Sequence, residues 1–153
     1  DRAVGTSVAQ MLARIGVDAV ANGIPGATLF PARTRGDYSM VMSGWGTLTG
    51  EAHYTLSSLG HSNDPAKRMG AFNWRNYNNP QIDKVLQDAA VELDDAKRKA
   101  LLEEANRIFM ADRPSLPLVA VGSAWTYQKG KVKLTRVRVD EDTLAYDVAP
   151  LTN

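Results

Sequence analysis

Apolar residues recur every three or four positions in several stretches of the chain, a spacing that predicts amphipathic helices. The two clearest stretches are neighbours, at residues 80–93 and 95–112, and the second carries its apolar stripe opposite a charged face. The predicted stripe residues are Ile82, Val85, Leu86, Ala89, Ala90 and Leu93 in the first helix, and Leu101, Ala105, Ile108 and Phe109 in the second. Three further helices are predicted at residues 7–15, 27–35 and 51–59.

Local residues at the helix boundaries support the two clear helices. Asn79 followed by Pro80 supplies a capping side chain and a proline at the first helical position, where a missing N–H costs nothing. Asp94 or Asp95 supplies the capping carboxylate of the second helix, and Pro114 ends the helical region.

Apolar, β-rich runs between the helices predict strands. The most continuous run covers residues 38–43 and reads as a buried strand. Other strands are predicted at residues 17–24, 116–121, 123–127 and 132–139. Helices and strands in this order predict an α/β domain, with a mixed sheet flanked by helices. Residues 60–79, rich in Gly, Asn, Asp and Pro, predict a long loop of the kind that often carries function.

Composition narrows the possible classes of protein. The 153 residues suit a single domain spanning residues 1–153, and the 18 basic side chains nearly balance the 17 acidic ones. Basic side chains form no stripe with interleaved aromatics, which argues against a nucleic-acid partner. The chain contains no cysteine, so disulfides and thiolate metal sites are excluded. No apolar stretch approaches the roughly 20 residues of a membrane-spanning helix.

The sequence MVMSGWGTLTGEAHY at residues 40–54 carries the most suggestive chemistry. A tryptophan lies between two glycines where a strand is predicted to end, followed by hydroxyls and a carboxylate. Glycines let a backbone approach a ligand closely, and an indole offers a rigid apolar wall. The alternative interpretation is that Trp45 fills the core or plugs a hinge.

Three catalytic or cofactor interpretations of this region have weaker support. The spacing of Gly44, Gly46 and Gly50 departs from the dinucleotide fingerprint, and no ribose-binding acid follows. Ser43 and His53 could serve a small α/β hydrolase, although Ser43 lacks the glycine two positions earlier that a nucleophile elbow uses. Two histidines eight positions apart make a poor metal site, so no metal and no cofactor is predicted.

Several motifs in order resemble one family. They are SVAQMLARIG at 7–16, GDYSM at 36–40, SGWG at 43–46, YNNPQID at 77–83, LPL at 116–118 and WTYQKG at 125–130. Together they resemble the C-terminal lobe of extracytoplasmic solute-binding proteins of ABC importers, in the peptide/nickel/opine class. The resemblance covers nearly the whole chain and implies one lobe of a two-lobe, type II-like periplasmic-binding-protein fold. It also implies that the chain is a fragment without the N-terminal lobe.

The resemblance implies a function that is not enzymatic. A small solute, such as a peptide, an opine-like compound or a metal chelate, would be captured between two lobes and delivered to a membrane permease. The expected ligand-binding residues are Trp45, Gly46, Thr47, Thr49 and Glu51, with Asn73 from the long loop. Peptide-binding relatives often place an Asp soon after the Gly-Trp pair, whereas this chain has Leu48 there and Glu51 as the nearest acid.

Two expectations concern the setting of the protein. The resemblance implies a periplasmic or extracytoplasmic location, with a possible membrane anchor in the full-length parent. A lobe separated from its partner exposes apolar surface, so weak self-association is also expected.

Overall fold

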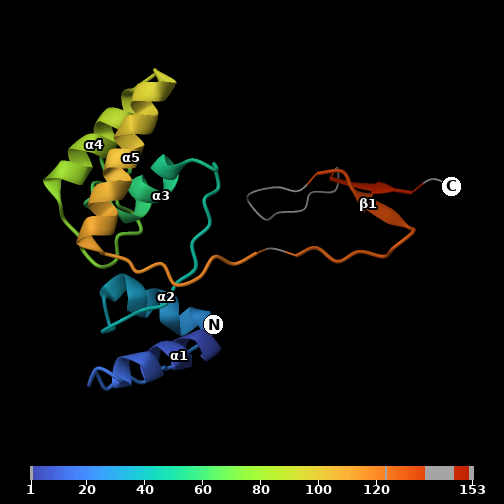
Figure 1. Cartoon of the computed structure of the whole chain (residues 1–153), viewed down its shortest axis with the longest axis horizontal. Helices are drawn as coiled ribbons and strands as arrows, with labels where there is room; N and C mark the ends of the chain where they lie inside the picture. The colour runs from blue at the N-terminus through green and yellow to red at the C-terminus, as the bar shows by residue number, and fades with distance from the viewer. Residues whose placement is uncertain (1, 123, 137–146, 152–153) are drawn as a thin grey trace. The chain divides into compact units, whose positions relative to one another are not determined.

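The structure is a computed structural model that describes residues 2–122, 124–136 and 147–151. These residues form five helices and two short strands (Figure 1). The chain divides into two compact units, Asp1–Gly44 and Trp45–Asn153. Each unit is described below by itself, and membership of both in one lobe stays a prediction.

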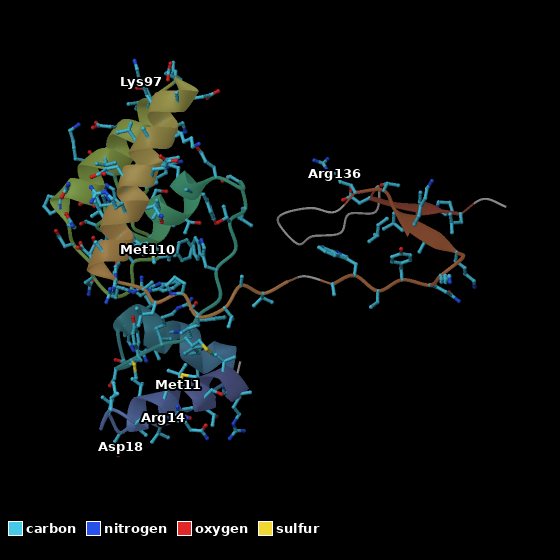
Figure 2. The ribbon with its side chains drawn as sticks, in the orientation of Figure 1. Met11, Arg14, Asp18, Lys97, Met110 and Arg136 are labelled. Carbon is cyan, nitrogen blue, oxygen red and sulfur yellow. The ribbon has the colours of Figure 1, made fainter. Side chains whose placement is uncertain are left out.

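The first unit contains two helices, α1 (Arg2–Ala13) and α2 (Gly26–Arg35). Both were predicted, although α1 begins several residues before the predicted start and α2 tolerates a proline inside it. None of the described residues of either helix is buried. Met11, labelled on α1 in Figure 2, is 62% exposed. These helices therefore present apolar side chains without a core of their own.

The second unit is organised around three helices, α3 (Ala52–Leu59), α4 (Pro80–Val91) and α5 (Asp95–Asp112). All three were predicted, and they pack on one another through a single apolar cluster. Its buried members are Leu56, Ile82, Leu86, Ala89, Leu102, Ala105, Ile108 and Phe109. Three details of the predicted stripes were wrong, and one of them is Ala90, which is exposed on α4. Leu102 is buried although it was not predicted, and Leu93 is 94% exposed because α4 has already ended at Val91.

The predicted helix caps are confirmed. The side chain of Asn79 accepts a hydrogen bond from the Gln81 N–H, and Pro80 occupies the first turn of α4. The side chain of Asp94 accepts from the Lys97 N–H at 2.9 Å. Each cap satisfies a backbone donor that has no partner within the helix.

The predicted mixed sheet is not formed by the described residues. Their sheet has two antiparallel strands, β1 (Val132–Leu134) and β2 (Val148–Pro150), with Val132 opposite Pro150. The predicted strand at 132–139 is thus confirmed only in its first three residues, and 137–139 lie outside the described residues. The predicted strands at 17–24, 38–43, 116–121 and 123–127 are irregular wherever they are described. A β-rich composition needs a partner strand for its backbone groups before it becomes a strand.

The predicted long loop at residues 60–79 is confirmed and is held against the helices. Backbone bonds run from the Gly70 N–H to the Ser57 carbonyl at 2.8 Å and from the Phe72 N–H to the Ser58 carbonyl at 3.1 Å. Inside the loop, Asp64 and Met69 form an isolated antiparallel bridge. The loop is therefore fixed along the second half of α3, which positions its aromatic residues.

A polar cluster joins the start of α4 to the end of α5. The Tyr77 hydroxyl and the Asn79 amide both donate to one oxygen of the Asp112 carboxylate, at 2.6 and 2.7 Å. These donors, Tyr77 first, hold the pKa of Asp112 below its ordinary value of 3.8. Burial, and then the bond to Asp112, raises the pKa of Tyr77 to about 12, so its hydroxyl remains a donor at neutral pH.

Acidification is therefore expected to weaken the link between α4 and α5. A carboxyl whose pKa is lowered by folding stabilises the fold above its unfolded pKa, and that stabilisation disappears as the pH falls through the folded pKa. We expect the free energy of unfolding to fall less steeply in Asp112→Asn than in the wild type, between about pH 6 and about pH 3. Urea unfolding at each pH measures this difference.

Tyr77→Phe provides the matched variant, because it removes the hydroxyl and keeps the ring that packs edge-on against Phe109. It should reduce the same acid dependence, and combining it with Asp112→Asn should add little. Equal acid slopes in the wild type and both variants would contradict this role of Asp112.

Candidate functional site

Four aromatic side chains gather beside α3, and we call Trp45, Tyr54, Phe72 and Trp74 the aromatic cluster. Trp45 stacks on Tyr54 with ring centroids 5.6 Å apart and meets Phe72 edge-on at 5.2 Å. Phe72 in turn meets Trp74 edge-on at 5.5 Å. Trp45 is half-buried and Phe72 is 40% exposed, so the cluster reaches the surface.

Two threonines fix the polar edge of Trp45. The indole N–H of Trp45 donates to the Thr55 hydroxyl oxygen at 3.0 Å. The hydroxyls of Thr55 and Thr47 are hydrogen-bonded to each other at 2.7 Å. Both stacking and hydrogen bonding therefore restrict the orientation of the indole.

The glycines beside Trp45 leave the backbone accessible. A Cβ added at Gly44 or Gly46 would meet no other atom within 4 Å, and both residues are exposed. Thr49 is also exposed, and its hydroxyl accepts a bond of 3.3 Å from the Glu51 N–H. This stretch consequently offers backbone and hydroxyl groups on an open surface next to the aromatic cluster.

Glu51 is paired within the protein. Its two carboxylate oxygens accept hydrogen bonds from Arg98 of α5, at 2.6 and 2.9 Å. The Arg98 guanidinium also donates to the Ala89 carbonyl near the end of α4, so it ties together three helices. This pairing holds the pKa of Glu51 below its ordinary value of 4.5. A ligand amine would have to share the carboxylate with Arg98.

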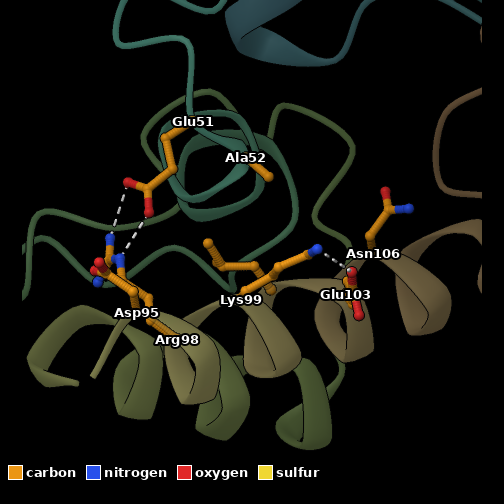
Figure 3. Close-up of a pocket in the computed structure, with 8 residues that line it drawn as sticks. Glu51, Ala52, Asp95, Arg98, Lys99, Glu103 and Asn106 are labelled. Atoms are coloured by element: carbon orange, nitrogen blue, oxygen red, sulfur yellow. Dashed lines mark hydrogen bonds and ion pairs between the residues drawn. The ribbon is translucent and has the colours of Figure 1, made fainter. Parts of the chain in front are cut away.

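A shallow pocket of about 390 Å³ opens beside this ion pair (Figure 3). It lies over one face of α5 and is bounded by the start of α3. Its lining residues are Glu51, Ala52, Asp95, Arg98, Lys99, Leu102, Glu103 and Asn106. A second, looser ion pair, Lys99 with Glu103 at 3.8 Å, lies along the same face. Internal pairing therefore occupies much of the charge around the pocket.

Asn73, predicted as a possible ligand contact, is buried and bonded to the backbone. Its side-chain N–H groups donate to the carbonyls of His61 and Tyr77, and its side-chain oxygen accepts from the Tyr77 N–H. These bonds give Asn73 a structural role in the long loop, next to Phe72 and Trp74 of the aromatic cluster. A direct contact of Asn73 with ligand stays a prediction.

The hydrolase alternative finds no support. Ser43 belongs to the first unit and His53 to the second. The Ser43 hydroxyl accepts a hydrogen bond from Arg33 at 2.9 Å and donates to the carbonyl of Gly44. Burial, and then the nearby Arg98, lowers the pKa of His53. Within its own unit, the Ser43 hydroxyl is bonded to Arg33 and Gly44 rather than to a base.

The structure therefore brings Trp45 and Thr47 into one bonded group. It places Thr49 and Glu51 on the following turn, in contact with each other. Sequence reasoning missed Tyr54, Thr55 and Phe72. The first two follow Trp45 by nine and ten positions and reach it only because residues 47–51 form a turn before α3. The sequence pattern did not indicate that this turn brings the start of α3 back to the indole of Trp45.

No group of three or more metal-binding side chains was found among the described residues. No described helix combines the length and apolar character that crossing a membrane requires.

Comparison with known proteins gives one consistent similarity. The chain is 35% identical over 113 residues to the glutathione-binding protein GsiB of Pectobacterium atrosepticum, which is 72% of this chain and 21% of that protein. It is 35% identical over 80 residues to proteins of the same name from Escherichia coli and Shigella dysenteriae, covering 52% of this chain and 15% of each relative. The matched part is thus about a fifth or less of these relatives. No family model matches the chain, and no solved structure matches it significantly.

Proposed function

We propose that this chain is part of a solute-binding component of an ABC importer and that its solute is a glutathione-like peptide. The observation that carries the proposal is the 35% identity to a glutathione-binding protein over 72% of the chain. The motifs from residue 7 to residue 130 that resemble solute-binding proteins support the same assignment. The chain would form the C-terminal lobe, and the rest of the full-length parent would supply the opposite wall of the binding site.

The ligand-binding surface would centre on Trp45. Its indole, held by stacking and by Thr55, would form one wall for a peptide-like solute. Gly46 would let the solute approach the backbone, and Thr47 and Thr49 would supply hydroxyls. Glu51 would contribute through the ion pair with Arg98 rather than as an unpaired carboxylate. Asn73 would support the surface by holding the long loop.

The remaining assignments follow from this role. The full-length parent would work in the periplasm or another extracytoplasmic space and would deliver its solute to a membrane permease. Ligand contacts with both lobes would stabilise the closed form. The exposed apolar side chains of the first unit would produce weak self-association of the chain, which sedimentation at increasing concentration can measure.

Glutathione binding to this chain tests the proposal. If both lobes together bind at about 1 μM and each supplies half of the free energy, this chain alone should bind at about 1 mM. Trp45→Ala should weaken that binding at least about tenfold, because an aromatic wall is a typical dominant contact. An NMR titration with glutathione, followed on backbone amides, is sensitive in this range.

Trp125→Phe is the control, since it also changes a tryptophan but lies outside the aromatic cluster. It should leave the dissociation constant within about twofold of the wild type. Absence of any saturable response to glutathione would contradict the proposed solute. A micromolar dissociation constant for glutathione on this chain alone would contradict the proposal that two lobes share the ligand contacts.

A further inference from the structure

The dipeptide Asn22–Gly23 of the first unit has a sequence that favours an intramolecular reaction of asparagine. A backbone nitrogen can attack the side-chain amide carbon of the asparagine that precedes it and close a five-membered ring. Ring closure is easiest when the following residue is glycine, because glycine has no Cβ to restrict its backbone or hinder the approach. Asn22 is the only asparagine in the chain that precedes a glycine.

The structure leaves this dipeptide free to react. Asn22 and Gly23 are both exposed and lie in the irregular stretch between α1 and α2. No backbone hydrogen bond joins residues 18–24 to any other described residue. The backbone can therefore rotate the Gly23 nitrogen toward the Asn22 side chain without losing a hydrogen bond, as is typical of segments that open at almost no cost in free energy.

Other asparagines lack this combination of neighbour and surroundings. Asn73 is buried, and its amide donates to two backbone carbonyls. Asn79 caps α4 and is followed by Pro80, which has no N–H to lose. Asn106 lies inside α5, where the next backbone N–H belongs to the hydrogen bonds of the helix.

We propose that Asn22 is a site of spontaneous deamidation. The Gly23 nitrogen gives its proton to hydroxide and bonds to the Asn22 side-chain carbon, and the amide C–N bond breaks as the departing nitrogen takes a proton from water and leaves as ammonia. Water then opens the resulting succinimide at either carbonyl, which gives an aspartate or an isoaspartate. No atom is oxidised or reduced, and the formal net charge falls by one from its value of +1.

Mass spectrometry of the whole chain, kept folded at mildly alkaline pH and then digested with trypsin, measures the reaction. Trypsin releases residues 15–33 as one peptide, in which Asn22 is the only asparagine. A sample unfolded in guanidinium chloride gives the rate without structure. We expect the folded chain to react within about threefold of the unfolded rate, because the segment needs almost no free energy to open.

Hydroxylamine provides an independent readout, because it attacks the succinimide and cleaves the chain after Asn22. The folded chain should give two fragments, residues 1–22 and 23–153. Asn22→Gln should give neither the fragments nor the charge change over the same period, since glutamine would have to close a larger ring.

Gly23→Ala tests the need for glycine. The added Cβ would have only the Arg2 Cδ within 4 Å, at 4.0 Å, and Gly23 does not have a positive φ, so the variant should fold. It should slow the conversion of Asn22 several-fold. Gly44→Ala is the control, because it adds the same methyl group to another exposed glycine of the first unit with free space around it, and it should leave the rate unchanged.

Three results would overturn the proposal: a folded chain that reacts more slowly than this threefold range, a chain that hydroxylamine leaves intact, or an unchanged rate in Gly23→Ala. The reaction involves no solute, so its failure would leave the proposed function standing. A chain that deamidates at Asn22 and does not bind glutathione would contradict the proposed function alone.

Discussion

Leu86→Ala is expected to destabilise the second unit by about 2–5 kcal/mol, the usual cost of removing a buried leucine side chain. Leu86 is fully buried on α4 and belongs to the cluster shared by α3, α4 and α5. The alanine would leave a cavity that three packed helices can close only in part. Since small domains are stable by only about 5–15 kcal/mol, the loss should be evident in urea unfolding followed by circular dichroism.

Leu93→Ala is the matched control for this prediction. The same side chain is truncated, but Leu93 is 94% exposed beyond the end of α4, so its removal should change the free energy of unfolding by less than about 0.5 kcal/mol. A similar loss in both variants would contradict the observed core. The pair also distinguishes the structure from the sequence pattern, which assigned both leucines to one buried stripe.

The helices of the second unit were predictable because their signals are local. Asn79 and Asp94 cap the helices that follow them, and Pro80 fits only a first turn. The apolar spacing then identified most of the core without knowledge of the partners. The error at Leu93 arose because spacing alone does not say where a helix ends.

The strands were less predictable because pairing depends on residues far apart in the sequence. Residues 38–43 and 116–121 have strand-like composition, but no described segment pairs with either of them. β1 was found in its predicted run, whereas its partner β2 lies in a segment where no strand was predicted. Composition can indicate that a segment favours a strand, but it cannot supply the neighbouring strand.

The candidate site was predictable only in the part that is local in sequence. A tryptophan between two glycines marked the region, and Thr47 follows the second of these glycines. The partners that orient Trp45 come from α3 and from the long loop, so only the fold brings them together. Glu51 was predicted to contact the ligand as the nearest acid, and its pairing with Arg98, 47 positions later, had no sequence signal.

Gly70→Ala is expected to destabilise the second unit by about 2–5 kcal/mol, because two costs add. Gly70 has φ of +69°, where an alanine is strained by about 1–2 kcal/mol. Its added Cβ would also lie 2.4 Å from the Ser62 carbonyl oxygen and 2.5 Å from that of His61. Both obstacles are backbone atoms, which cannot move aside as a flexible side chain can.

Gly50→Ala measures the strain of an alanine at positive φ without the clash. Gly50 has nearly the same φ, +71°, but its added Cβ would meet no atom within 4 Å, so a loss of only about 1–2 kcal/mol is expected. Thermal unfolding of the two variants and the wild type measures the difference. Equal losses of stability in the two variants would mean that the loop at residues 60–79 moves to accommodate the methyl group at Gly70 and is not tightly held.

The two glycine variants should also differ in their effect on the candidate site. The Gly70 N–H anchors the long loop to the Ser57 carbonyl, and Phe72, two residues later, packs against Trp45. Relief of the clash at Gly70 would move this part of the loop, so Gly70→Ala should alter tryptophan fluorescence in the folded protein and weaken the proposed binding of glutathione. Gly50→Ala leaves the anchor at Ser57 intact and should alter both much less. The close approach of Gly70 to the carbonyls of His61 and Ser62 thereby connects the stability of the long loop to the orientation of the Trp45 indole.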